Sequence, residues 1–182
     1  MAISPGNQPS NETINDFLTA AWQNEVDLIK NLAAEYPVFV DPLQPYLTAA
    51  LSTACNSGQA EAARLLVEEY HADVNARRND GMTMLHEALN SADMITAKML
   101  IQHGADINAQ DPQGATPLHY AVFHGSEEMV RFLLQTGVNK TLKDEEGQTP
   151  SEYARDKGRT QIADLIEAFP AHARPKKRQP KP

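Results

Sequence analysis

Histidine is the residue type whose spacing in this sequence most suggests chemistry. His86 and His119 lie in the middle of the chain, with His103 between them and His124 shortly after. A metal site needs three or four ligands at characteristic spacings, and no carboxylate or further ligand cluster accompanies these histidines. A single cysteine, Cys55, also excludes a multi-cysteine zinc site. We therefore expect no metal ion, and the alternative is that His86 and His119 bond to threonines that cap helices.

Patterns typical of catalytic sites are missing from the sequence. It has no phosphate-binding glycine-rich loop, no Gly-x-Ser-x-Gly and no His-Glu-x-x-His motif. We expect no enzymatic activity and no cofactor.

One period runs through most of the chain. Leucines recur with steps of 33, 34 and 33 at Leu18, Leu51, Leu85 and Leu118. Alanines follow three positions later, at Ala21, Ala54, Ala88, Ala121 and Ala154. Two rows of glycines share the period, namely Gly81, Gly114 and Gly147, and then Gly58, Gly125 and Gly158 with Ala92 in the missing place. Four rows with one period indicate a repeat array.

Two segments in this register share one motif, Thr83-Met84-Leu85-His86-Glu87-Ala88 and Thr116-Pro117-Leu118-His119-Tyr120-Ala121. They match Thr-Pro-Leu-His-x-Ala, so residues 14–169 resemble the ankyrin-repeat family. The resemblance implies an all-α solenoid of stacked helix-turn-helix units with β-turn tips. The expected repeats are 14–45, 46–78, 79–110, 111–143 and 144–169, of which the first and last are degenerate caps. We expect residues 1–13 and the basic tail 170–182 to be disordered.

The fourth repeat shows the local signals most clearly. Residues 111–114 predict a turn, and Thr116 followed by Pro117 predicts the start of a helix. Gly125 permits a tight reversal before a second helix over about 126–135.

The position that follows the alanine row holds Cys55, Leu89 and Val122. Cys55 is therefore predicted to be a buried packing thiol rather than a nucleophile. Trp22 stands in the same register, where an indole fits only if space remains at the open end of the array.

Charge is distributed unevenly along the 182 residues. The chain has 24 acidic and 16 basic side chains and a net charge of −8. Five basic groups lie in the last nine residues, at Arg174, Lys176, Lys177, Arg178 and Lys181, so the rest of the chain carries −13. An acidic surface favours basic partners and repels phosphate backbones, and we expect no nucleic-acid binding. The basic tail resembles a nuclear-localisation signal, and the alternatives are a solvated end or a segment that folds back on the acidic body.

No apolar run approaches the roughly 18 residues of a membrane span, and the start of the chain lacks the features of a secretory signal. We therefore expect no membrane association, and a location in the cytoplasm or, if the tail acts as a signal, in the nucleus. Without a heptad pattern or a long apolar edge, the sequence predicts a monomer.

The resemblance also implies where a partner protein docks, on the concave side formed by the turn tips and the first helices. The corresponding residues here are Arg77, Asn79, Asp80, Met82, Asn90, Ser91, Gln110, Gln113, Phe123, His124, Glu145, Glu146, Gln148 and Asp156. The fold does not require an apolar residue at Met82 or Phe123, which makes both candidate interface anchors. Local packing of Phe123 against Tyr120 or a neighbouring tip is an equal alternative.

These observations favour non-catalytic binding of a partner protein that carries basic residues. The alternatives are a dedicated chaperone or assembly factor that shields a basic client, and a stoichiometric inhibitor of an enzyme. A chaperone or assembly factor should bind its basic client with an affinity that falls steeply as the salt concentration rises.

Overall fold

The computed structural model describes residues 8–41 and 44–170, and these residues form ten α-helices, one 3₁₀ helix and no β-strand. The expected tail from residue 171 onward and residues 1–7 lie outside the described residues. The chain divides into two compact units, unit 1 (residues 1–106) and unit 2 (residues 107–182). The all-α fold class is therefore confirmed.

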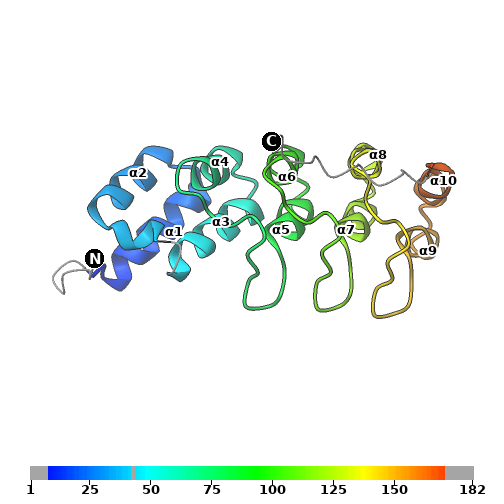
Figure 1. Cartoon of the computed structure of the whole chain (residues 1–182), viewed down its shortest axis with the longest axis horizontal. Coiled ribbons are helices and arrows are strands. Elements are labelled where there is room, and N and C mark those ends of the chain that lie inside the picture. The colour runs from blue at the N-terminus through cyan, green and yellow to red at the C-terminus, as the bar shows by residue number, and fades with distance from the viewer. Residues whose placement is uncertain (1–7, 42–43, 171–182) are drawn as a thin grey trace, which may run out of the picture. The chain divides into compact units, whose positions relative to one another are not determined.

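Unit 1 consists of three consecutive helix pairs in two layers (Figure 1). One layer contains α1 (Asn11–Gln23), α3 (Pro45–Asn56) and α5 (Met84–Asn90), and the other contains α2 (Val26–Glu35), α4 (Ala60–Glu68) and α6 (Met94–Gln102). Within each layer every helix packs against the next one along the chain. Because a single pair buries too little apolar surface, this packing between neighbours is what forms the core.

Unit 2 repeats the arrangement with two helix pairs, α7 (Pro117–His124) with α8 (Glu127–Gln135), and α9 (Pro150–Asp156) with α10 (Thr160–Ala168). Its core includes Leu118, Val130 and Ile166, all of which are almost fully buried. Ion pairs from Arg155 to Asp164 and Glu167 join the last two helices, at 3.0 and 2.9 Å.

The connection between α2 and α3 contains the 3₁₀ helix η1 (Pro37–Val40). Its Phe39 is fully buried, stacks on Phe17 of α1 with ring centroids 4.5 Å apart, and meets Tyr46 of α3 edge to face at 5.5 Å. Aromatic pairs at such distances add stability beyond their buried area. The 3₁₀ helix thus fastens α1 of the first helix pair to α3 of the second.

Helix α1 begins at Asn11, so the prediction that residues 1–13 are disordered is wrong for residues 11–13. The Ser10 hydroxyl accepts a hydrogen bond from the Thr13 backbone N–H, and the Ser10 carbonyl accepts one from Ile14. Serine is a favourable N-cap because it satisfies a backbone donor that would otherwise lack a partner. This signal lies before residue 14, where the first repeat was expected to begin.

The turn inside each helix pair places one residue in the left-handed backbone region. The row of positive φ angles comprises Asn24 (62°), Gly58 (69°), Ala92 (56°), Gly125 (70°) and Gly158 (71°). Ala92 therefore adopts the conformation of the glycines that it replaces, and Asn24 is a member of the row that the sequence pattern did not reveal. Asparagine tolerates this conformation better than most residues, and the Asn24 Oδ1 also accepts a 2.8 Å bond from the Ala62 N–H, which caps α4.

The predicted role of the two repeat histidines is confirmed. His86 Nδ1 accepts from the Thr83 backbone N–H at 3.2 Å, and His119 Nδ1 accepts from that of Thr116 at 3.1 Å. Each pair completes a capping box at the start of α5 or α7. His119 also lies 3.1 Å from the Gln148 carbonyl through its Nε2, so the neutral ring with hydrogen on Nε2 satisfies both contacts.

This arrangement predicts that acid destabilises the protein through His119. Burial lowers the pKa of His119 below its ordinary value of 6.5, although the Gln148 carbonyl and Asp144 oppose the shift. The unfolded chain therefore binds the proton more readily, and stability should fall as the pH decreases through 6.5. Urea denaturation at pH 7.5 and about 5.5 measures the loss. His119→Gln retains a capping-box side chain and should show a smaller loss, whereas equal losses would contradict the assignment.

Cys55 is fully buried, as predicted, and burial raises the pKa of its thiol well above the ordinary range. Trp22 is 55% exposed, in agreement with the space expected around it. Leu28 of α2 is 37% exposed.

Candidate protein-binding surface

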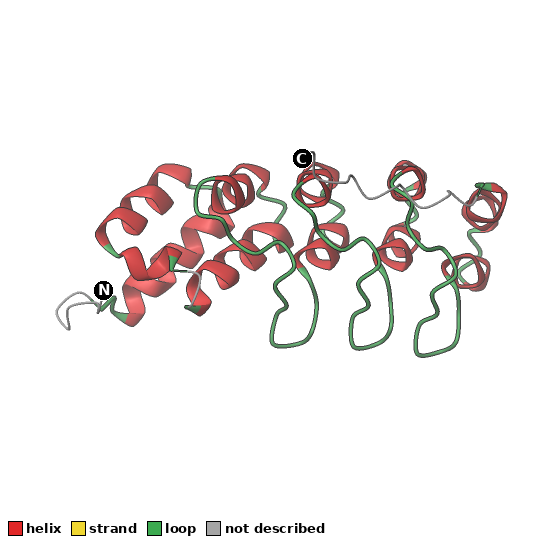
Figure 2. Cartoon of the chain, viewed as in Figure 1, coloured by secondary structure: helices red, strands yellow, loops and turns green. Residues whose placement is uncertain are grey.

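Three long loops, here called tips, precede α5, α7 and α9 and extend beyond the helices (Figure 2). In unit 2 an aspartate organises each tip. Asp111 Oδ1 accepts from the backbone N–H groups of Gln113 and Ala115, at 2.9 and 2.8 Å. Asp144 Oδ1 does the same for Glu146 and Gln148, at 3.1 and 2.8 Å. These bonds fix the turns that present the predicted tip residues.

The tip of unit 1 is built differently. Arg78 stands in the register of Asp111 and forms a 2.7 Å ion pair with Glu87 of α5, whose side chain is only 1% exposed. The second guanidinium nitrogen pairs with Asp80 at 3.1 Å. In unit 2 the matching pair is Asp111 and Tyr120, joined by a 2.9 Å bond from the phenol to the carboxylate. Unit 1 therefore has an ion pair between arginine and glutamate where unit 2 has a hydrogen bond from a neutral phenol to a carboxylate.

In unit 1 the predicted site residues fall into two groups. Arg77, Asn79, Asp80 and Asn90 are exposed, whereas Met82 and Ser91 are half-buried. The Ser91 hydroxyl donates to the Cys55 carbonyl at 2.9 Å and lies 3.1 Å from the carbonyls of Glu87 and Ala88. Its hydroxyl therefore joins α5 to α3 and is largely committed to the fold.

In unit 2 the structure exposes Gln110, Gln113, Phe123, Glu145, Glu146 and Asp156, and half-buries His124 and Gln148. The Gln110 amide nitrogen donates to the Gly114 carbonyl at 2.8 Å and to the Lys143 carbonyl at 2.9 Å. It therefore ties one tip to the next, which gives the two tips of unit 2 a fixed spacing.

Phe123 lies near the end of α7 and is 54% exposed. Its ring meets the His124 imidazole edge to face, with centroids 5.3 Å apart. The buried face of α7 is formed by other residues, including Leu118 and Val122, which are fully buried. Neither helix formation nor the core of unit 2 depends on the outer part of the Phe123 ring.

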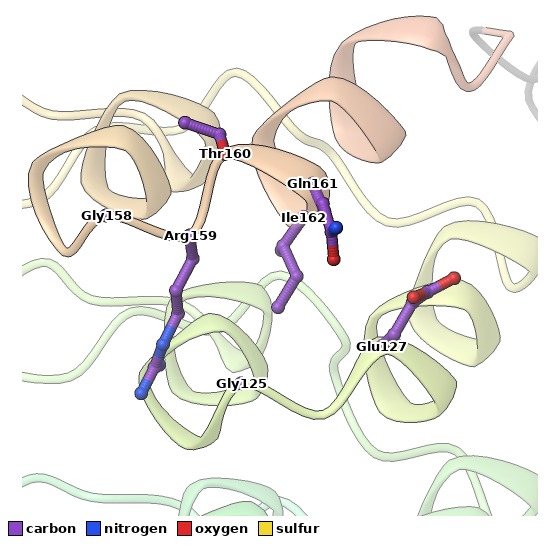
Figure 3. Close-up of a pocket in the computed structure, with 7 residues that line it drawn as sticks. All are labelled: Gly125, Glu127, Gly158, Arg159, Thr160, Gln161 and Ile162. Carbon is purple, nitrogen blue, oxygen red and sulfur yellow. The ribbon is translucent and has the colours of Figure 1, made fainter.

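Arg159 reaches from the α9–α10 turn to the end of α7 (Figure 3). Its Nη1 donates to the carbonyls of Val122 and Phe123, which are among the last in the helix. A cation at a helix C-terminus satisfies free carbonyls and favours the helix dipole. The same side chain lines a hollow of about 420 Å³ together with Gly125, Glu127 and Ile162. Arg159 therefore fixes the backbone that carries Phe123.

Replacing Gly125 with alanine should destabilise the protein by about 1–2 kcal/mol through its positive φ, and further through contact with Arg159. A Cβ at Gly125 would lie 3.2 Å from the guanidinium, whereas one at Gly158 would meet nothing within 4 Å. Because φ is nearly equal at the two glycines, 70° and 71°, Gly158→Ala is the matched control. Urea denaturation should show the larger loss for Gly125→Ala, and equal losses would mean that the Arg159 contact contributes nothing.

The repeats of this chain match a known protein family. The family model for ankyrin repeats (three copies) matches residues 17–111 and 93–173. The chain belongs to the ankyrin-repeat family. No individual curated protein matches it. Ankyrin repeats generally mediate protein–protein interaction, and ankyrin-repeat proteins are typically interaction modules rather than enzymes.

The described part of this ankyrin-repeat chain contains no group of three or more histidine, cysteine, aspartate or glutamate side chains placed to hold a metal ion. Among the same residues no helix is both long enough and apolar enough to cross a membrane.

Three residues important to the ankyrin tips and turns were not identified from the sequence. Arg78 and the buried Glu87 form the ion pair of the unit 1 tip, and their signal was the register, because they stand one period before Asp111 and Tyr120. Arg159 had no such signal. It follows Gly158, the last glycine of the repeating row, and only the fold brings its side chain to the carbonyls at the end of α7.

Proposed function

We propose that the protein is a non-catalytic binding module, and that it binds a basic segment of a partner protein with its tips and first helices. In the ankyrin family these elements form the concave face. The observation that carries the proposal is the exposure of Phe123, whose aromatic ring is 54% accessible on a first helix. Aromatic side chains are enriched among the few residues that supply most of the binding energy of interfaces.

The charges near Phe123 support a basic partner. Glu145 and Glu146 on the last tip and Asp156 on α9 are exposed. Asp156 pairs with Lys157 at 3.0 Å, a surface pair with side chains about half exposed, 52% and 46%. Such pairs contribute little, so a partner's lysine or arginine can compete for the carboxylate. Residues 107–170 carry ten acidic and six basic groups, and residues 8–106 carry fourteen and five.

An assembly factor that shields a basic client is the second candidate, and this acidic excess in both units favours it. The two candidates differ in how many carboxylates of this protein the bound partner contacts. An adaptor that depends on Phe123 should retain much of its affinity at high salt, whereas a charge-shielding chaperone should lose most of its affinity. An inhibitor that covers an enzyme's active site would use the same face and is distinguished by loss of that enzyme's activity.

Phe123→Asp tests the anchor. With the full chain as bait in an extract of its native organism, the substitution should reduce capture of the partner at least 30-fold, about 2 kcal/mol. Partners are identified by mass spectrometry after washes at low and high salt. Because the ring is half exposed, the thermal melt followed by circular dichroism should not change.

Ile95→Asp is the matched control, since it also places a carboxylate at an exposed apolar residue, 62% accessible on α6. It should leave capture unchanged. If both variants lose the partner, the binding site is not the tip and first-helix surface. If Phe123→Asp lowers the melting temperature markedly, Phe123 packs against the fold and is not an anchor.

We further propose that the chain acts as a monomer in the cytoplasm, with the basic residues between Arg174 and Lys181 available as a nuclear import signal. Replacing those five residues with glutamine should abolish any nuclear accumulation of a fluorescent fusion while leaving capture of the partner intact.

A further inference from the structure

The three first-layer helices of unit 1 each end in an exposed amide side chain. Gln23 is the last residue of α1, Asn56 of α3 and Asn90 of α5, and all three are exposed. They stand in one register, with steps of 33 and 34 residues. None of the three side chains forms a hydrogen bond with another described residue. Because a side-chain amide offers both donors and an acceptor, this amide row can pair with the backbone of a bound chain.

Trp22 adds an apolar group beside the amide row. It directly precedes Gln23 on α1 and is 55% exposed. The residues in its register, which are Cys55, Leu89 and Val122, are fully buried. The fold thus encloses smaller side chains at this position and leaves much of the indole ring on the surface, where a ligand can contact it.

The charges of the first-layer helices in unit 1 have one sign. Neither lysine nor arginine occurs in α1, α3 or α5. Glu12 and Asp16 of α1 are exposed, and Glu87 of α5 is buried against Arg78. The basic residues of unit 1 lie instead on the second-layer helices or in the tip, at Lys30, Arg64, Lys98, Arg77 and Arg78. Charge complementarity on this layer therefore favours a basic ligand over an acidic one.

The spacing of the amide row determines which ligand conformation fits it. Helix α1 packs against α3, and α3 packs against α5, and packed helices lie about 8–10 Å apart. A polyproline II segment advances about 9.3 Å in each turn of three residues and makes no internal hydrogen bonds. It can therefore offer a backbone group to one amide per turn. A β-strand repeats after about 6.6–6.8 Å, which does not match the row.

From these observations we propose that the amide row and Trp22 bind a basic, proline-containing segment of a partner protein in the polyproline II conformation. The three amides hydrogen-bond to the backbone of the segment, and one of its prolines packs on the indole ring, as aromatic side chains do in polyproline recognition. Its lysine or arginine side chains are attracted by the carboxylates of α1. This inference rests on the proposed function, because it specifies the basic segment that the first helices bind.

Fluorescence anisotropy with the full chain and three fluorescein-labelled peptides tests the inference. The first peptide repeats Pro-Ala-Lys over about 12 residues, or about four turns of polyproline II. Alanine replaces proline in the second peptide, and glutamate replaces lysine in the third. The first should bind at least about tenfold more tightly than either of the others. Its binding should also shift the emission of Trp22, the only tryptophan of the chain, to shorter wavelength, because a proline ring displaces water from the indole.

Substitutions then test the contacts one by one. Trp22→Ala should weaken binding of the first peptide at least about tenfold. Asn56→Ala should weaken it about three- to tenfold, as expected for the loss of one hydrogen bond. Asn31→Ala is the matched control, because Asn31 is an exposed asparagine of the second-layer helix α2, and it should leave binding unchanged. Since all three residues are exposed, the thermal melts should not change.

Several results would overturn the inference. These are equal or tighter binding of either control peptide, unchanged binding by Trp22→Ala, and equal losses for Asn56→Ala and Asn31→Ala. Deletion of residues 171–182 supplies a further test. If it alters the emission of Trp22, the basic, proline-containing tail of the chain itself occupies this face. A dimer, detected by light scattering, that Trp22→Ala dissociates would assign the face to a second copy.

Failure of this inference is distinguishable from failure of the proposed function. If Phe123→Asp removes the captured partner but the proline peptide does not bind, the protein binds a basic segment of another conformation. If the proline peptide binds as expected but Phe123→Asp leaves capture unchanged, the anchor in unit 2 is wrong and the site in unit 1 stands.

Discussion

Replacing Arg78 with aspartate is expected to destabilise the protein by about 3 kcal/mol, because it leaves the buried Glu87 carboxylate beside a second negative charge. Glu87 is 1% exposed, and its carboxylate lies 2.7 Å from the Arg78 guanidinium. Removal of one partner from a buried ion pair typically costs about 3–5 kcal/mol. The lower end applies because the Arg78 side chain is 43% exposed, which lets water screen part of the lost interaction.

Arg77→Asp is the matched control for this variant. It makes the same change of charge at the adjacent residue, which is exposed and donates a 2.7 Å bond to the Gly81 carbonyl within the tip. We expect it to cost less than about 1 kcal/mol. Urea denaturation followed by circular dichroism gives both values, and similar small losses would show that the Arg78–Glu87 pair does not stabilise unit 1.

A second substitution should rescue the first. Glu87→Gln in the Arg78→Asp background removes the repulsion, and it supplies a donor of nearly the same shape for the new carboxylate. The pairing of Asp111 with the Tyr120 phenol at 2.9 Å shows that a neutral donor serves at this position in unit 2. The double-mutant cycle should give a coupling of at least about 1 kcal/mol, and strict additivity would contradict a direct interaction.

Replacing Leu118 with alanine is expected to cost about 2–5 kcal/mol, the range for truncation of a buried leucine. Leu118 is fully buried and begins the apolar face of α7, which packs against both α8 and α9. The cavity cannot collapse easily, because the capping box at Thr116 and the Arg159 bonds at Val122 hold both ends of the helix. The expected loss therefore lies toward the upper part of this range.

Ile95→Ala removes a similar volume from an exposed position and provides the control. Since 62% of that side chain is already accessible to solvent, its truncation should change the stability by no more than about 0.5 kcal/mol. If the two variants lose equal stability in urea, the leucine ladder does not form the core of the repeats.

Much of the fold follows from local signals in the sequence. The threonine caps, the proline at the first helical position and the glycines of the reversing turns each act over a short stretch of chain, so the repeat period sufficed to place them. The same reasoning assigned His86 and His119 to capping boxes, and the structure confirms both. It failed at the start of α1, where Ser10 caps a helix that begins before residue 14, the expected start of the first repeat.

The candidate binding residues were harder to assess from the sequence. The repeat register placed Ser91 and Gln148 beside Phe123 as equivalent surface residues. In the structure the Ser91 hydroxyl is bonded to carbonyls of α3 and α5, and the Gln148 side chain is half-buried, with its Oε1 covered from solvent. Whether a side chain stays available depends on which backbone atoms of the neighbouring repeat lie within reach, and the register does not contain that information.

The sequence by itself determined the repeat, the helix starts and the acidic character of the body, because period, caps and composition are properties of the chain. Only the tertiary structure decided which charges are paired. Arg78, Arg159 and Arg64 look alike in the sequence, yet one neutralises a buried glutamate, one caps a helix and one is exposed on the surface of α4. The reason is physical: an arginine's role depends on the acceptors that lie within the length of its side chain, and folding brings those acceptors from other repeats.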